Sequence, residues 1–208
     1  MTVEPVTPRG RRTRDRLLAG AREVFEARGF SDTRMSDISI AAGVSHGTVY
    51  TYFESKEAVL YALCTSVSAE VFEAVRVPDD LRIDPVRRIE EGNRRYLRVY
   101  ASHARMLEVV EQAATADPGF RAVLDGLRGG FVEKAKGTLS RFQSDGLADP
   151  GVDVEIAGPA LVGMVESFAR RWYAHGAAYD VEHVVVTLSQ LWARAIGLAV
   201  PDPQGAQR

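Results

Sequence analysis

The segment 33–56, TRMSDISIAAGVSHGTVYTYFESK, constrains the fold of this chain more than any other. Its apolar residues recur three and four positions apart, which predicts two short helices with one buried face each. Met35 and Ile38 belong to the buried face of the first helix, and Val49 and Phe53 to that of the second. Gly43 lies between them and can take the positive φ that ends a helix. Ser45 is a good N-cap for the second helix. Two helices joined by a tight, glycine-containing turn form a helix-turn-helix unit, whose second helix can enter a DNA major groove.

Gly29–Leu63 resembles the TetR family of transcriptional regulators. The matching residues are Gly29-Phe30, Thr33, Asp37-Ile38, Ala42-Gly43-Val44-Ser45, Gly47-Thr48-Val49-Tyr50, Tyr52-Phe53, Ser55-Lys56-Glu57 and Leu60. The rest of the chain matches the family only in its helical layout. The resemblance implies an all-α fold of about nine helices, with a three-helix DNA-binding domain followed by a helical ligand-binding and dimerisation domain.

The distribution of proline, glycine and charge suggests where the parts begin and end. We expect a disordered arm at 1–10, a DNA-binding domain at 11–71 with the helix-turn-helix at about 34–53, a ligand-binding and dimerisation domain at 72–200, and a flexible tail at 201–208. The helix that follows Ser55 contains neither Pro nor Gly as far as Val75, so it can couple the two domains.

Helical periodicity continues through the body of the chain. Predicted helices cover Pro85 to Tyr100, Met106 to Ala113, Phe120 to Phe142, Val154 to His175, and Val181 to Leu198. Pro159 falls inside the fourth of these patterns, which indicates either a kink or a later start.

Charge is distributed unevenly along the chain, whose net charge is −2. Residues 1–53 hold 8 Arg against 6 Asp and Glu, and five of these arginines lie between Arg9 and Arg16. Positive charge at one end suits a protein that meets phosphate with that end only. A basic N-terminal arm can reach phosphates or the minor groove, although a solvated basic tail would look the same.

Candidate DNA contacts follow from side-chain chemistry and from the resemblance. Thr48 and Tyr50 can contact base edges or a thymine methyl. In the family, residues that match Thr33, Thr48, Tyr52 and Lys56 commonly touch the phosphate backbone. His46 stands where many members carry Lys or Arg. The full predicted set is Arg11, Arg12, Thr33, Ser45, His46, Gly47, Thr48, Tyr50, Tyr52 and Lys56, and the predicted partner is double-stranded DNA with a near-palindromic operator.

Core packing is the more frequent explanation for any single aromatic residue in the body. As a set, in a chain that resembles a family with ligand-binding bodies, five of them suggest a cavity for an apolar or acyl-CoA-like small-molecule effector. They are Tyr96, Tyr100, Phe131, Phe168 and Trp172. The nearby Arg94, Arg95, Arg98 and Arg105 form either a solvated face or contacts to an anionic ligand. The last two predicted helices carry wide apolar faces, so we expect them to form a homodimer through Leu161, Met164, Phe168, Val181, Val184, Leu188, Leu191 and Trp192.

Other kinds of site receive little support from the sequence. No phosphate loop, nucleotide fingerprint or nucleophile motif occurs, so no enzyme and no cofactor are expected. The histidines have no second ligand at metal-like spacing. A single cysteine, Cys64, and no long apolar run suit a cytoplasmic protein without a membrane span. The sequence therefore predicts a ligand-released repressor. The alternative is a helical protein-interaction module that keeps the helix-turn-helix as scaffold.

Overall fold

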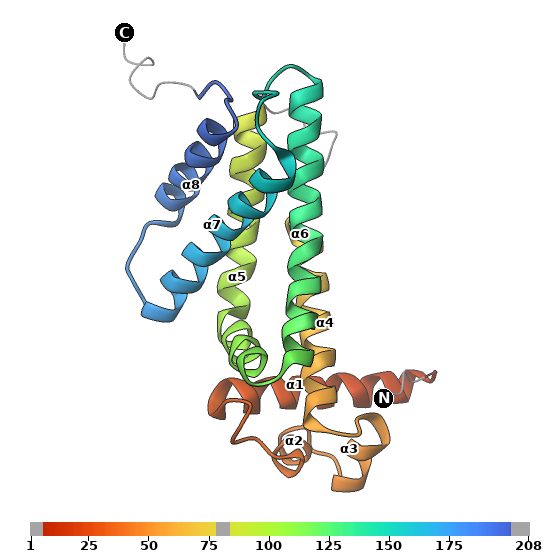
Figure 1. Ribbon diagram of the computed structural model, residues 1–208. Helices are drawn as coiled ribbons and strands as arrows, with labels where there is room; N and C mark the ends of the chain where they lie inside the picture. Colours follow the sequence, from red (N-terminus) through yellow and green to blue (C-terminus); the bar gives the residue numbers. More distant parts are fainter. Residues whose placement is uncertain (1–5, 78–83, 201–208) are drawn as a thin grey trace. The chain divides into compact units, whose positions relative to one another are not determined.

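The computed structural model describes residues 6–77 and 84–200. Within these residues eight helices follow one another and no strand occurs, which confirms the predicted all-α class (Figure 1). They are α1 (Pro8–Arg28), α2 (Met35–Ala41), α3 (His46–Tyr52), α4 (Lys56–Ala74), α5 (Pro85–Ala116), α6 (Pro118–Ser144), α7 (Val154–His175) and α8 (Val181–Ala195).

Helix α5 is one continuous helix of 32 residues, although its sequence predicts two. The residues between the two predicted segments, 101–105, read ASHAR and contain neither Pro nor Gly. Nothing in them removes a backbone hydrogen bond or favours positive φ, so the helix continues. Helix α7 likewise runs through Pro159 from the N-cap Asp153, so the later start is wrong.

The N-terminal basic segment is helical rather than a disordered arm that extends to residue 10. Helix α1 starts at Pro8, and the Thr7 side chain caps it by accepting a hydrogen bond from Gly10 N at 3.1 Å. Proline suits the first position of a helix because the missing N–H would have no partner there. Residues 1–5 of the predicted arm, residues 78–83 and the predicted tail at 201–208 lie outside the described residues.

The chain divides into two compact units. Unit 1 comprises residues 1–70 and 103–127, and unit 2 comprises residues 71–102 and 128–208. Helices α4, α5 and α6 each contain residues of both units. The first division lies next to the expected domain boundary after residue 71. The grouping of residues 103–127 with unit 1 was not expected.

Unit 1 has a core of apolar side chains from its helices, and the predicted inward positions Val49 and Phe53 are fully buried in it. Gly20 lets α1 approach α2 closely, because a Cβ at this position would stand 2.7 Å from Ala42 N. Cys64 is buried, and burial raises the pKa of its thiol to about 12, so this cysteine is a small residue of the core.

Unit 2 has a separate core in which α5, α6, α7 and α8 meet. Its buried members are Val86, Ile89, Leu139, Phe142, Ala148, Leu161, Ala193, Ile196 and Leu198. A buried hydrogen bond of 2.9 Å from Asn93 Nδ2 to Ser189 Oγ joins α5 to α8. Of the helices in the described residues, none has a stretch long and apolar enough to cross a membrane.

Candidate DNA-binding surface and ligand region

Helix α3 is held by its N-cap and by its buried face. The predicted cap is confirmed, because Ser45 Oγ accepts a hydrogen bond from Thr48 N at 3.3 Å. The two hydroxyls, Ser45 Oγ and Thr48 Oγ1, lie 2.7 Å apart. Val49 anchors the inner face of the helix, and Phe53 caps its end. The side chains on the opposite face are consequently held outward.

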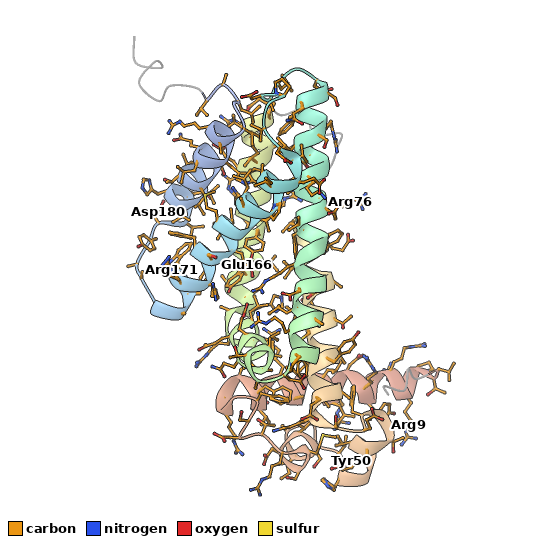
Figure 2. The ribbon with its side chains drawn as sticks, viewed as in Figure 1. Arg9, Tyr50, Arg76, Glu166, Arg171 and Asp180 are labelled. Atoms are coloured by element: carbon orange, nitrogen blue, oxygen red, sulfur yellow. The ribbon has the colours of Figure 1, made fainter. Side chains whose placement is uncertain are left out.

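The outward face of α3 combines one aromatic pair with an open backbone. His46 and Tyr50 are exposed, and their rings meet edge to face with centroids 5.2 Å apart. The Tyr50 side chain is at the surface of unit 1 (Figure 2) and keeps 51% of its area exposed. Gly47 has open space around it, so a ligand can approach the backbone there. Thr48 and Tyr52 are half-buried at the margin of this face.

The turn between α2 and α3 depends on a residue that the sequence did not single out. Gly43 has the predicted positive φ, 62°. Arg16 of α1 donates from Nη2 to Ala42 O at 2.7 Å and to Gly43 O at 2.9 Å. These carbonyls end α2 and need outside donors. Arg16 therefore fixes the turn, and the basic sequence around it gave no sign of this role.

The arginines of α1 divide between solvent and the interior of unit 1. Arg9, Arg11 and Arg12 are exposed. Arg14 is half-buried, with its guanidinium carbon 5.7 Å from the centroid of the Phe53 ring. Only part of the basic cluster is thus available for phosphate.

Thr33 is a poor candidate for a phosphate contact. It is 1% exposed, and its hydroxyl donates to Gly29 O at 2.7 Å. The N-cap of α2 is Arg34, whose backbone N donates to the Asp37 carboxylate at 2.9 Å. The Thr33 hydroxyl closes the loop after α1, so the predicted phosphate contact finds no support in the geometry of this side chain.

Lys56 is also engaged within the chain. Its ammonium donates to Phe30 O at 2.9 Å, Ser31 O at 3.1 Å and Thr33 O at 3.1 Å. The same nitrogen lies 4.6 Å from the centroid of the Phe30 ring. The predicted phosphate contact finds no support in this geometry, because each of the three N–H donors of an ammonium has a partner.

The five predicted pocket residues lie within one series of ring contacts in unit 2. Tyr96 contacts Tyr100 at 5.8 Å and Phe131 at 6.2 Å, and Phe168 contacts Trp172 at 6.0 Å. Tyr173 joins the two groups, because its ring stacks on Tyr100 at 5.7 Å and on Trp172 at 4.8 Å. Phe72 and Tyr179 extend the series at its two ends, where they contact Phe131 and Phe168, respectively. Tyr173, Phe72 and Tyr179 come from three different segments, and their positions in the sequence do not predict that they join this series.

An ion pair between Arg128 and Glu166 lies near these rings. Arg128 Nη2 and Glu166 Oε1 are 2.6 Å apart. Burial raises the pKa of the Tyr96 hydroxyl well above its usual value, and the nearby Glu166 carboxylate adds to the rise. Of the arginines considered for an anionic ligand, Arg94 and Arg95 are paired with Glu91, and Arg94 also binds Glu182. Their charges are therefore partly neutralised within the chain.

A small cavity lies at another place in unit 2. Its volume is about 10 Å³, room for about one water molecule. Its lining residues are Ala135, Thr138, Leu139, Phe142, Gly158, Leu161, Trp192 and Ile196, none of which belongs to the predicted pocket set.

The predicted dimer residues divide into buried and exposed groups. Leu161, Val184 and Leu188 are at most 8% exposed in the single chain, so the chain itself covers them, contrary to the expectation that a partner would. Val181 and Leu191 are exposed, whereas Met164, Phe168 and Trp192 are partly buried. Ile156 of α7, which was not predicted, is 69% exposed.

Residues 17–63 match the family model for bacterial regulatory proteins, tetR family. The HTH-type transcriptional regulator EthR of Mycolicibacterium smegmatis is 27% identical over 94% of both chains. The fatty acid metabolism regulator protein of Bacillus subtilis is 21% identical over 79% of this chain and 86% of its own.

Solved structures that share the fold include two FadR regulators. The fatty acid degradation regulator FadR of Bacillus halodurans has a TM-score of 0.79 at 20% identity and covers 94% of this chain and 100% of its own. The FadR structure from Bacillus subtilis, in complex with stearoyl-CoA, has a TM-score of 0.75 at 21% identity, with coverages of 88% and 98%. The family match, the relatives and the helix-turn-helix geometry agree: residues 17–63 form a DNA-binding domain of the tetR family, and the whole chain is similar to transcriptional regulators.

Proposed function

We propose that the chain is a homodimeric repressor that binds a near-palindromic operator through α3 and leaves it when a small molecule binds in unit 2. The observation that carries the DNA-binding part is the structure of α3. Its inner face is fixed by Val49 and its outer face presents His46, Gly47 and Tyr50 to solvent. A short helix held in this way is what enters a major groove.

The proposed contacts divide into base readout and positioning. Tyr50 and Thr48 read base edges, with His46 beside Tyr50 and Gly47 allowing close approach. Arg11 and Arg12 of α1, together with Ser45 and Tyr52, contact phosphate or sugar, which positions α3 without reading sequence. Thr33 is left out because its hydroxyl is buried and already bonded.

The proposed effector is apolar or acyl-CoA-like and binds among the aromatic rings of unit 2. The ring series from Phe72 to Tyr179 supplies apolar surface, and Arg128 and Tyr96 supply polar groups. One relative is named a fatty acid metabolism regulator, and one structure of similar fold holds stearoyl-CoA. Both support an acyl chain as the first ligand to test.

Release requires that ligand binding and DNA binding oppose each other. Helices α4, α5 and α6 contain residues of both units, so each can carry a displacement from one unit to the other. A tenfold loss of operator affinity needs about 1.4 kcal/mol of coupling, within the usual range for allosteric proteins.

The test starts from genomic DNA fragments of the source organism that the purified protein retains. Binding to a retained fragment is then measured with stearoyl-CoA, with coenzyme A alone and without addition. We expect steep weakening with salt, because several Arg–phosphate contacts release counterions, and release by stearoyl-CoA but not by coenzyme A. If no fragment is enriched over bulk DNA, the chain acts instead as a helical interaction module. If fragments bind but stearoyl-CoA has no effect, only the ligand assignment is wrong.

A further inference from the structure

Lys56 is placed where it ties the two ends of the helix-turn-helix together. It is the first residue of α4, and its carbonyl partners belong to residues 30, 31 and 33, just before α2. The residues between these anchor points contain α2, the turn and α3. One ammonium therefore holds both ends of the DNA-reading segment at a fixed separation.

The donor geometry of Lys56 is complete without DNA. An ammonium has three N–H donors and no acceptor, and all three are used by carbonyls between 2.9 and 3.1 Å away. The aromatic face of Phe30, 4.6 Å from the nitrogen, adds an attraction for the cation. A phosphate would have to replace one of these partners.

The residues around Lys56 extend the tie to other helices of unit 1. The Phe30 ring meets Phe25 of α1 at 5.6 Å and Phe120 of α6 at 5.8 Å. The loop that carries the three carbonyls is thus packed against α1 and α6 through Phe30 and is bonded to α4 through Lys56. Its position sets where α2 begins.

We propose that Lys56 is a positioning residue that holds the helix-turn-helix in its DNA-binding geometry and makes no phosphate contact. This inference rests on DNA binding by α3. The two roles differ in what they do to the salt dependence of binding. Binding weakens with salt, so the slope of log K against log salt is negative. Removal of one phosphate contact makes this slope shallower by about 0.9. Loss of a positioning tie lowers the fraction of competent protein and leaves that slope unchanged.

The experiment uses a duplex that the wild-type protein selects from a random-sequence pool. Selection by itself tests DNA binding, so its failure would be separate from a failure of this inference. Lys56→Ala should bind that duplex about tenfold more weakly at every salt concentration with an unchanged slope, and should melt at a lower temperature without DNA. Arg12→Ala, at an exposed position, is the matched control. It should make the salt slope shallower and leave the melting temperature unchanged.

Two further variants keep the test decisive if Lys56→Ala does not fold. Lys56→Arg keeps the charge, but a planar guanidinium cannot replace a compact ammonium among three converging carbonyls. Lys56→Arg should therefore bind DNA as weakly as Lys56→Ala. If Lys56 contacted a phosphate, the arginine would keep that contact and binding would be close to that of the wild type. Phe30→Leu changes no charge and should weaken binding with an unchanged slope. Two results would overturn the proposal. One is a shallower salt slope with an unchanged melting temperature in Lys56→Ala, and the other is full binding by Lys56→Arg.

Discussion

Single residues of unit 1 determine how closely its helices can approach. Gly20 is in the middle of α1, where glycine is less favourable than alanine by roughly 1 kcal/mol. The structure explains this choice, because Ala42 N and Ala41 C would lie 2.7 and 2.9 Å from an added Cβ. Backbone atoms cannot give way as a flexible side chain can.

Gly20→Ala should therefore destabilise the protein by about 1–3 kcal/mol, as overpacking commonly does. Gly126→Ala is the matched control in the same unit. Gly126 is also within a helix, but no atom lies within 4 Å of its added Cβ. The control should gain about 0.5–1 kcal/mol from helix propensity. Urea unfolding followed by circular dichroism measures both, and equal behaviour of the two variants would show that α1 and α2 are not in tight contact.

His103 makes the stability of unit 1 depend on pH. The side chain is 6% exposed, its Nε2 lies 3.2 Å from Glu70 Oε2, and its Nδ1 is buried without a hydrogen-bond partner. Burial lowers the pKa of the imidazole, and Arg22 lowers it further against the opposite pull of Glu70 and Glu26. The folded state therefore favours neutral histidine.

Because the pKa of His103 is lower in the folded protein than its ordinary value, acid reduces the stability of the folded state. The contribution of His103 is complete above pH 6.5, its ordinary pKa, and is lost as the pH falls through the lower folded pKa. Chemical unfolding at pH 7.5 and at pH 5 should show a smaller acid loss for His103→Gln than for the wild type. His183→Gln, at an exposed position, should keep the wild-type loss. A full acid loss in His103→Gln would contradict this assignment.

At the scale of the element, α3 buries one face in unit 1 and presents the other face to solvent, where it can contact DNA. Tyr50 and Thr51 are neighbours and both are exposed, but Tyr50 is supported by the His46 ring. Tyr50→Ala should change which bases are preferred at one position of each half-site, by about 1–3 kcal/mol. His46→Ala should weaken the same preference, because it removes the ring that orients Tyr50. Selection from a random pool measures both, and Thr51→Ala should leave the selected sequence unaltered.

At the scale of the whole molecule, the chain buries part of the predicted dimer face and leaves another part uncovered. Leu191 is 47% exposed on α8, whereas Leu188 is 5% exposed. Leu191→Glu should yield a folded monomer, because the charge enters a seam between two copies. Leu188→Glu should unfold the chain instead, since the charge enters its own core.

Sedimentation together with circular dichroism distinguishes these outcomes. Leu147→Glu is the matched control, because Leu147 is 46% exposed and belongs to neither α7 nor α8. It should remain dimeric. A Leu191→Glu variant that sediments like the wild type would place the dimer contact elsewhere.

Features that depend only on neighbouring residues can be predicted from the sequence. The helices of the helix-turn-helix, the positive φ at Gly43 and the N-cap at Ser45 depend on residues close together in the sequence, so they could be predicted correctly. The inward positions Val49 and Phe53 followed from spacing along one helix. The start of α1 at Pro8 was missed although it is also local, because basic residues were interpreted as an arm.

The tertiary structure alone decided which partners the polar side chains have. Lys56 meets carbonyls 23 to 26 positions away, and Asn93 meets Ser189 across 96 positions. Side chains that look free in the sequence are thereby used inside the chain. Likewise, whether Leu188 faces a partner or the chain's own core depends on which helices cover α8. No periodicity encodes that, because an apolar face has the same pattern whichever surface buries it.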